Sequence, residues 1–174
     1  MSSPVQETDL LSSVELSNPA SFSIGDEWPA AEKCEKFVAF FLGGVLYCMA
    51  SKAVAEVVHP LPVAVLPHSP AWLSGIAAFR GEVIAVINTK EMLGHGELAA
   101  TRKAKLVILR SNAKETQFAI PVESMHELVA IKPQAVTSDP NASDGMTRLA
   151  EHDNNVLTMI DAEILFERLA KSFD

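Results

Sequence analysis

The chain has 174 residues, of which 48% are hydrophobic, and carries a formal net charge of −8 at pH 7. That length allows one domain with a hydrophobic core, or two small domains that share a core. The acidic balance argues against a nucleic-acid partner, because phosphate binding requires clustered Lys and Arg side chains. No apolar run is long enough to span a membrane. Two cysteines, Cys34 and Cys48, are too few for a disulfide scaffold, so we expect a cytoplasmic protein.

Residues 1–35 differ from the rest of the chain in composition. Residues 1–24 are rich in Ser and show no hydrophobic periodicity, and the N-terminus lacks the basic start and apolar run of a secretory signal. We expect this tail to be disordered. The alternative is a docking segment, whose anchors would be Leu10, Leu11, Val14, Leu16 and Trp28.

The first ordered elements are predicted to be short strands. Apolar runs at 37–42 and 45–49 flank Gly43-Gly44, a pair that is typical of a tight hairpin turn. A short amphipathic helical segment is expected at 51–58, and a further short strand at 63–66.

A second hairpin is expected further along the chain. Its strands would lie at 76–79 and 83–87, with the turn at Gly81-Glu82. Asn88 follows directly, and its side chain is of the type that caps a helix. This order of hairpin, strand and capped helix is the most regular in the chain.

The second half of the chain repeats the order of the first. Its predicted elements are strands at 106–109, 117–122 and 155–160, a short amphipathic segment at 123–129, and a loop at 132–145. Asp161 is predicted to cap a C-terminal helix that extends to about residue 173. The helix would bury one face, formed by Leu165, Phe166, Leu169 and Phe173, the last of which lies outside the residues that the structure describes.

The repetition can be aligned residue by residue. Tyr47–Ala50 corresponds to Phe118–Pro121, and Val83–Asn88 corresponds to Val156–Asp161. Two related halves of short strands favour two small β-barrels, because closure of a sheet removes its exposed edges. The expected fold is therefore mainly β, with two pseudo-symmetric barrels, short helices and a C-terminal helix.

The sequence contains no recognisable catalytic or metal-binding motif. No two histidines have the spacing of metal ligands such as HxxxH, and neither cysteine lies in a CxxC motif. Ser74 lacks the GxSxG elbow of a nucleophilic serine, and Gly94-His95-Gly96 lacks the Lys and Ser/Thr of a phosphate-binding loop. We expect a protein that is not an enzyme and that needs no cofactor or metal.

Arg80 and Glu56 are the two charged residues that occupy marked positions. Arg80 ends a strand beside Gly81, and Glu56 has a counterpart, Glu127, in the second half. One interpretation is structural: the planar guanidinium of Arg80 binds carbonyls or a carboxylate, for which Glu56 is a candidate. The other is functional: Arg80 lies at the rim of a protein-binding groove. The two interpretations are compatible.

The stretch Trp72–Ile87 reads WLSGIAAFRGEVIAVI. Its aromatic-aliphatic start, its Arg80-Gly81 pair and the two apolar pairs that follow resemble the signature of the CheW-like domain family. The resemblance covers about residues 36–170 and extends to further stretches, namely Phe37–Leu42 with Tyr47, Val54–Val58, and Val156–Phe166.

This resemblance implies two interleaved five-stranded barrels of SH3-like type, in a CheW-like domain that spans residues 36–174. It also implies a non-catalytic adaptor, recruited to membrane-associated receptor arrays without inserting into the membrane. Its partners would be the cytoplasmic tip of methyl-accepting chemoreceptors and the regulatory domain of a CheA-type histidine kinase. By their positions in the family pattern, the protein-binding residues or their supports would be Glu56, Val57, Val58, Arg80, Gly81, Ile84 and Val86.

Three residues depart from the family pattern. Ala78 stands where the family usually has Asn, Ala85 where it has Pro, and Asn88 where it has Asp. A branch that controls type IV pili and twitching motility, the PilI-like branch, fits this chain at least as well as the main chemotaxis array. Two further alternatives are a small-molecule-binding β-barrel and a CheW-like regulatory module without receptor coupling.

Overall fold

The computed structural model describes residues 34–94, 101–111, 116–140, 142 and 145–172. The tail that the sequence predicts to be disordered lies, up to residue 33, outside the described residues. The described strands are β1 (Glu35–Leu42), β2 (Val45–Ala50), β3 (Val54–Val58), β4 (Val63–Ala64), β5 (Leu73–Phe79), β6 (Glu82–Ile87), β7 (Lys105–Arg110), β8 (Gln117–Val122), β9 (Ser124–Ile131), β10 (Val136–Ser138), β11 (Thr147–His152) and β12 (Asn155–Ile160). The helices are α1 (Thr89–Leu93), α2 (Ala162–Lys171) and two single 3-10 turns, η1 (Ser51–Ala53) and η2 (Pro133–Ala135).

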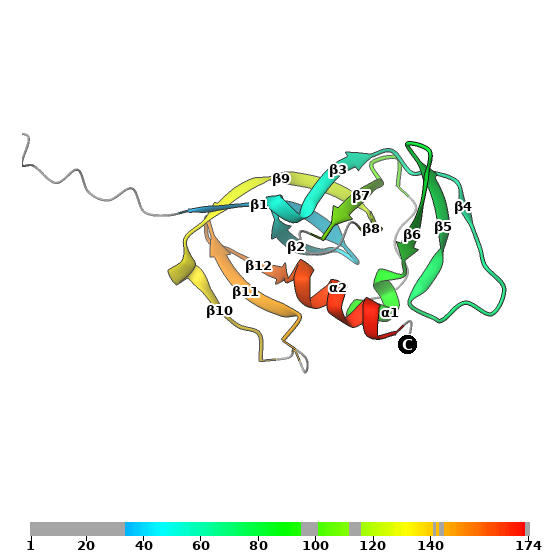
Figure 1. Cartoon of the computed structure of the whole chain (residues 1–174). Helices are drawn as coiled ribbons and strands as arrows, with labels where there is room; N and C mark the ends of the chain where they lie inside the picture. The colour runs from blue at the N-terminus through cyan, green and yellow to red at the C-terminus, as the bar shows by residue number, and fades with distance from the viewer. Residues whose placement is uncertain (1–33, 95–100, 112–115, 141, 143–144, 173–174) are drawn as a thin grey trace, which may run out of the picture. The chain divides into compact units, whose positions relative to one another are not determined.

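The strands form two sheets of the same design (Figure 1). Sheet A has the order β10-β11-β12-β2-β1-β9, and sheet B has the order β4-β5-β6-β8-β7-β3. Each sheet therefore has five longer strands and one short edge strand, β10 or β4. Each sheet also takes strands from both halves of the sequence, so the two halves are interleaved as expected.

The register of the two sheets confirms the internal repeat. In sheet B, β6 pairs in parallel with β8, and Ala85 lies opposite Phe118. In sheet A, β12 pairs in parallel with β2, and Thr158 lies opposite Tyr47. The sequence alignment equates Ala85 with Thr158 and Phe118 with Tyr47, so the two ladders have the same register. Each half of the chain thus completes the sheet of the other half.

Three hydrophobic clusters result from the alternation of side chains along these strands. The cluster inside the curl of sheet A contains Phe37, Ala39, Cys48, Val129, Ile131, Ala150, Leu157 and Met159. The cluster inside the curl of sheet B contains Ala77, Ile84, Val86, Leu106, Ile108 and Ala119. The third and larger cluster, which we call the inter-barrel core, is formed by side chains on the opposite face of each sheet from the first two clusters. It includes Phe40, Met49, Ile87, Leu109, Phe118 and Ile160.

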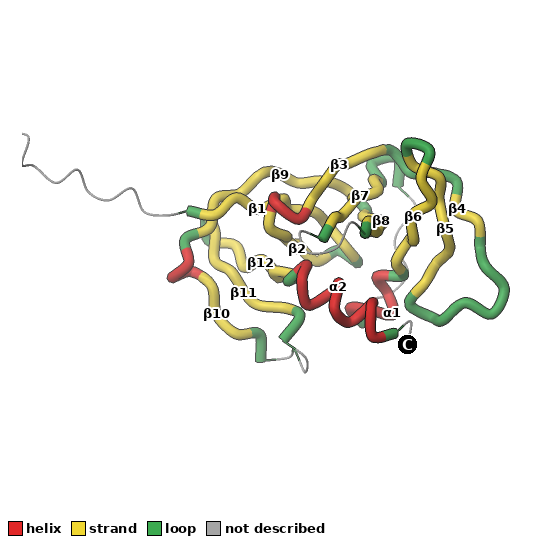
Figure 2. Tube along the Cα trace, viewed as in Figure 1, coloured by secondary structure: helices red, strands yellow, loops and turns green. Residues whose placement is uncertain are grey.

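Helix α2 covers the inter-barrel core, and it is the longer of the two α-helices (Figure 2). Leu165, Phe166 and Leu169 are buried there, as the sequence predicts, and the ring of Phe166 lies 5.1 Å from that of Phe118. Asp161 caps the helix: its Oδ1 accepts the backbone N–H groups of residues 163 and 164 at 3.0 and 3.3 Å. No helix in the described part of the chain is long and apolar enough to cross a membrane.

Two segments that the sequence predicts as helical are strands. Residues 51–58 form the single turn η1 followed by β3, and most of 123–129 belongs to β9. The prediction was wrong because it gave these valine-containing segments a helical period. The exposure of β3 instead alternates with a period of two, and both segments extend a sheet by pairing with β7 and β1. Hydrogen bonding to a neighbouring strand outweighed the weak local preference of these two segments for a helix.

Sequence reasoning also missed β10 and β11. Residues 132–145 were expected to form a loop, but η2 and β10 occupy part of that range. Strand β11 reads TRLAEH and buries fully only Ala150, so its hydrophobic signal is weak. Its partner β12 was predicted over the residues it occupies, and pairing with β12 along its whole length fixes β11 in the sheet.

Candidate protein-docking site

The candidate site is centred on the two-residue turn between β5 and β6. Phe79 pairs with Glu82, which leaves Arg80 and Gly81 as the turn. Both have positive φ angles, 51° and 84°, as the tight hairpin turns that match strand twist require. The turn therefore lies one residue before the predicted Gly81-Glu82. Glycine adopts this conformation freely, whereas Arg80 is held in it at a cost of about 1 kcal/mol or more.

Arg80 forms an ion pair with Glu56 of β3. Its Nη2 lies 2.6 Å from Glu56 Oε2, which confirms the carboxylate partner that the sequence suggests. The guanidinium carbon also lies 5.5 Å from the centre of the Phe79 ring. Both charged side chains are accessible, at 71% and 37%, so solvent screens the pair and it stabilises the fold by about 1 kcal/mol or less. Its main effect is to fix the position and direction of the guanidinium.

The ion pair connects β3 with the β5–β6 turn, and these two elements are not neighbours in sheet B. Strands β7 and β8 lie between β3 and β6 in the strand order. Contact between Glu56 on β3 and Arg80 on the β5–β6 turn therefore requires the sheet to curl. The pair closes one end of the sheet B barrel and remains open to solvent.

Among the described residues, the equivalent position in sheet A has no arginine–carboxylate pair. The β11–β12 turn is formed by Asp153 and Asn154, again with positive φ angles of 46° and 61°. Asp153 thus takes the place of Arg80, and Glu127 takes the place of Glu56. Each instead lies near an adjacent histidine: His126 Nε2 is 3.3 Å from Glu127 Oε1, and His152 Nε2 is 3.5 Å from Asp153 Oδ2. The ion pair between Arg80 and Glu56, which we call the arginine latch, therefore occurs in the sheet B barrel and not at the equivalent position of sheet A.

The predicted site residues fall into two groups. Arg80 and Gly81 are exposed, Val57 is 37% exposed, and Glu56 is partly exposed, so a partner can reach them. Val58 is partly buried against the cluster inside sheet B, and Ile84 and Val86 are each only 2% exposed in that cluster. The last two residues therefore support the site from within the barrel.

Sequence reasoning missed Val83, which is 71% exposed at the start of β6. Side chains alternate along a strand, so the burial of Ile84 places Val83 on the opposite, outer face. The period-two pattern of β6 contained this information, but it did not show which of the two faces would be buried.

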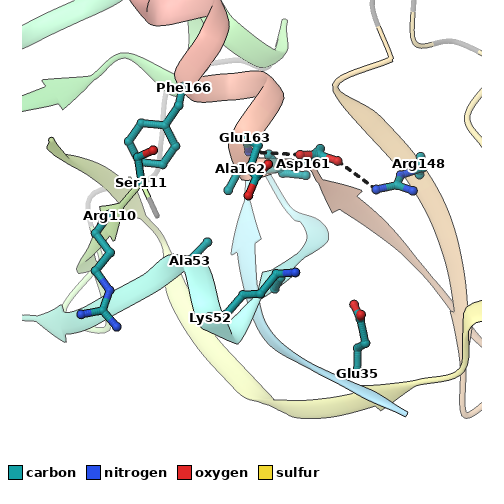
Figure 3. Close-up of a pocket in the computed structure, with 12 residues that line it drawn as sticks. Glu35, Lys52, Ala53, Arg110, Ser111, Arg148, Asp161, Ala162, Glu163 and Phe166 are labelled. Atoms are coloured by element: carbon teal, nitrogen blue, oxygen red, sulfur yellow. Dashed lines mark hydrogen bonds and ion pairs between the residues drawn. The ribbon is translucent and has the colours of Figure 1, made fainter. Parts of the chain in front are cut away.

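A small polar pocket lies at the start of α2, apart from the latch (Figure 3). It has a volume of about 210 Å³, and elements of both sheets line it. Arg148 donates to Asp161 Oδ2 at 2.9 Å, which orients the carboxylate that caps α2. The charged lining residues are Lys52, Arg110 and Arg148 against Glu35, Asp161 and Glu163, so the opposite charges balance.

Cys48 and His59 are two potentially reactive side chains in the described part of the chain. Burial raises the pKa of the Cys48 thiol to about 12, so it is protonated and unreactive at neutral pH. His59 lies 3.2 Å from Lys105 Nζ at the surface. Among the residues that the structure describes, no three His, Cys, Asp or Glu side chains are grouped so that they could hold a metal ion.

Comparison with known proteins decides the family. The model of the CheW-like domain matches residues 36–170, which is most of the chain. The chain belongs to the CheW-like domain family. A probable chemotaxis protein CheW of Rhizobium etli is 24% identical over 136 residues, which cover 75% of this chain and 86% of that protein. A chemotaxis protein CheW of Treponema pallidum is 28% identical over 124 residues, covering 68% and 72%.

The fold agrees with that of a solved CheW structure. The crystal structure of the scaffolding protein TtCheW from Thermoanaerobacter tengcongensis superimposes with a TM-score of 0.66. It is 24% identical in sequence and covers 74% of this chain and 89% of its own. The likeness confirms the expected fold of two SH3-like β-barrel subdomains, and the short strands β4 and β10 extend each barrel sheet beyond the predicted five strands.

Proposed function

We propose that this CheW-like domain is a non-catalytic adaptor that couples methyl-accepting chemoreceptors to a CheA-type histidine kinase. The family match over residues 36–170 carries this proposal, because the matched relatives are chemotaxis proteins and the similar solved structure is a scaffolding protein. In the cell the protein would be cytoplasmic and recruited to receptor arrays at the membrane. The pathway would be chemotaxis or the control of type IV pili and twitching motility.

The geometry around the latch supports a docking role. Arg80 is exposed, yet it is held in one direction by Glu56, by the Phe79 ring and by a fixed turn. Such a preorganised arginine loses little conformational freedom when it binds a carboxylate or a carbonyl of a partner. Buried Ile84 and Val86 keep the strand that carries the turn in place.

The test is direct binding to both partners. The purified protein is mixed with the regulatory domain of the CheA-type kinase and, separately, with a receptor-tip fragment, and each affinity is measured by calorimetry. The proposal requires binding to both, with Arg80→Ala or Glu56→Lys weakening at least one interaction without unfolding the domain. Arg148→Ala, which breaks an ion pair at the start of α2, is the matched control. If the wild-type protein binds neither partner, the proposal fails.

A further inference from the structure

The polar pocket at the start of α2 adjoins a second pocket at the end of the sheet A barrel. The polar pocket has a volume of about 210 Å³ and the second about 180 Å³, and Glu35 and Arg148 line both of them. The other residues that line the second pocket, which we call the apolar pocket, are Ile131, Pro133, Val136 and Met159. A charged space and an apolar space therefore share one wall.

The lining of the polar pocket is itself divided into an apolar inner part and a charged rim. The inner part consists of buried side chains, namely Ala53, Ile160, Ala162 and Phe166. Glu35 and Lys52, which line the same pocket, are exposed. A bound molecule would keep its charged groups at the rim, because a charge buried without a partner costs much free energy.

Two rim charges of opposite sign are left without an ion-pair partner among the residues that the structure describes. These are Glu35 and Lys52, whereas Arg148 already pairs with Asp161 at 2.9 Å. Figure 3 shows the Lys52 amine directed across the pocket, toward the side on which Glu35 and Arg148 lie. A zwitterion fits between the two unpaired groups, since Lys52 donates hydrogen bonds to an anion and Glu35 accepts them from a cation.

The sizes of the two pockets limit the molecule further. Pockets for drug-sized ligands measure roughly 300–1,000 Å³, so a pocket of about 210 Å³ takes a smaller one. Because Glu35 lines both pockets, a cationic group bound to it lies where the two pockets meet. The carbon that carries this cationic group can then direct a side chain into the apolar pocket. An α-amino acid carries an ammonium, a carboxylate and a side chain on one carbon, as this arrangement requires.

We propose that the two pockets together bind a free α-amino acid with an aliphatic side chain. Lys52 Nζ donates to the carboxylate, and the carboxylate of Glu35 accepts from the ammonium. The side chain of the ligand lies against Val136 and Met159 in the apolar pocket. This binding activity goes beyond the proposed adaptor function and does not depend on it.

The first test compares ligands that each lack one of the three recognised groups. L-leucine is titrated into the purified full-length protein by calorimetry, and glycine, 4-methylpentanoate and 3-methylbutylamine are titrated in parallel. Glycine lacks the aliphatic side chain, and the other two lack the ammonium and the carboxylate. Since the rim charges are exposed and solvent weakens their interactions, we expect a Kd of about 1 mM or lower for L-leucine. Each of the other three compounds should bind about fivefold more weakly or worse.

The second test changes the charged residues. Glu35→Gln and Lys52→Gln should each weaken L-leucine binding about fivefold or more, because each removes one of the two charges that face the ligand. Arg110→Gln is the matched control: Arg110 lines the same pocket, but Figure 3 shows its guanidinium directed away from Lys52 and Glu35. This variant should bind L-leucine as the wild type does. Thermal unfolding verifies that every variant is folded.

Four results would overturn the inference. The first is the absence of saturable binding of L-leucine at about 20 mM, well above the expected Kd. The second is equal binding of glycine and L-leucine, which would mean that the apolar pocket is not used. The third is normal binding by folded Glu35→Gln and Lys52→Gln. The fourth is an equal loss in Arg110→Gln, which would indicate general attraction to the charged rim. The adaptor function is unaffected by these results, because it is tested by binding to its protein partners.

Discussion

Gly75 packs its backbone directly against the backbone carbonyl of Ala64, closer than any side chain on Gly75 would permit. A Cβ at this position would also lie 2.8 Å from Cγ1 of Val63, and the φ angle of Gly75 is 149°, which non-glycine residues rarely adopt. The contact holds the short strand β4 against β5, and it thereby extends the sheet that carries Arg80 at its turn.

Gly75→Ala is therefore expected to destabilise the domain by about 2 kcal/mol or more, because strain and a backbone clash add. Urea unfolding measures the free energy. Gly81→Ala is the comparison, since a Cβ there meets nothing within 4 Å and only the φ angle of 84° is unfavourable. If Gly75→Ala and Gly81→Ala lowered the free energy of unfolding equally, β4 would be able to shift away from residue 75 without a loss of stability.

The Arg80–Glu56 pair should contribute more to binding than to stability. A double-mutant cycle with Arg80→Ala and Glu56→Ala is expected to give a coupling free energy of about 1 kcal/mol or less, which decreases as salt concentration rises. Unfolding in urea at low and high salt provides the values. A coupling well above that range, insensitive to salt, would mean that the latch is a structural element of the barrel.

Asp161 has two roles at the start of α2, and two variants separate them. Asp161→Ala removes both the cap and the partner of Arg148, and should destabilise the domain by about 1–2 kcal/mol. Asp161→Asn retains capping ability and loses only the charge, so its cost should be smaller. The free energies of unfolding are compared directly. If Asp161→Asn costs as much as Asp161→Ala, the ion pair matters more than the cap.

The two cysteines should differ sharply in reactivity. Cys34 is exposed and should react with a thiol reagent at neutral pH, whereas buried Cys48 should react only on unfolding. Burial raises the pKa of Cys48 from 9.0 to about 12, so the folded state favours the protonated thiol. Its contribution to stability is complete below pH 9 and is lost as the pH rises toward 12. Two thiols that react equally fast in the folded protein would contradict this burial.

Several features of the fold were accessible from the sequence because local and long-range signals agreed. Gly43-Gly44 marks a tight turn, and the apolar runs around it have strand length. Asp161 precedes a clear amphipathic helix. The repeat of Val83–Asn88 in Val156–Asp161 predicted two equivalent barrels, and the shared register of β6 with β8 and of β12 with β2 confirms it.

Other features depended on tertiary contacts that no local pattern encodes. Strand β9 was taken for a helix because its apolar residues lack strict alternation, and pairing with β1 decides its conformation. In β6, the sequence singled out Ile84 and Val86 as binding residues or their supports; both face the barrel interior, and Val83 faces outward. Which face of an apolar strand is buried depends on the other strands of the barrel.

The adaptor function is tested most directly by reconstitution. Membranes that contain the cognate receptor are mixed with the CheA-type kinase, with and without this protein, and sedimented, and the kinase in the pellet is quantified. We expect the kinase to sediment with the receptor only when the protein is present, and Arg80→Ala to reduce the amount. If the folded protein leaves the kinase in the supernatant, it does not couple the kinase to the receptor.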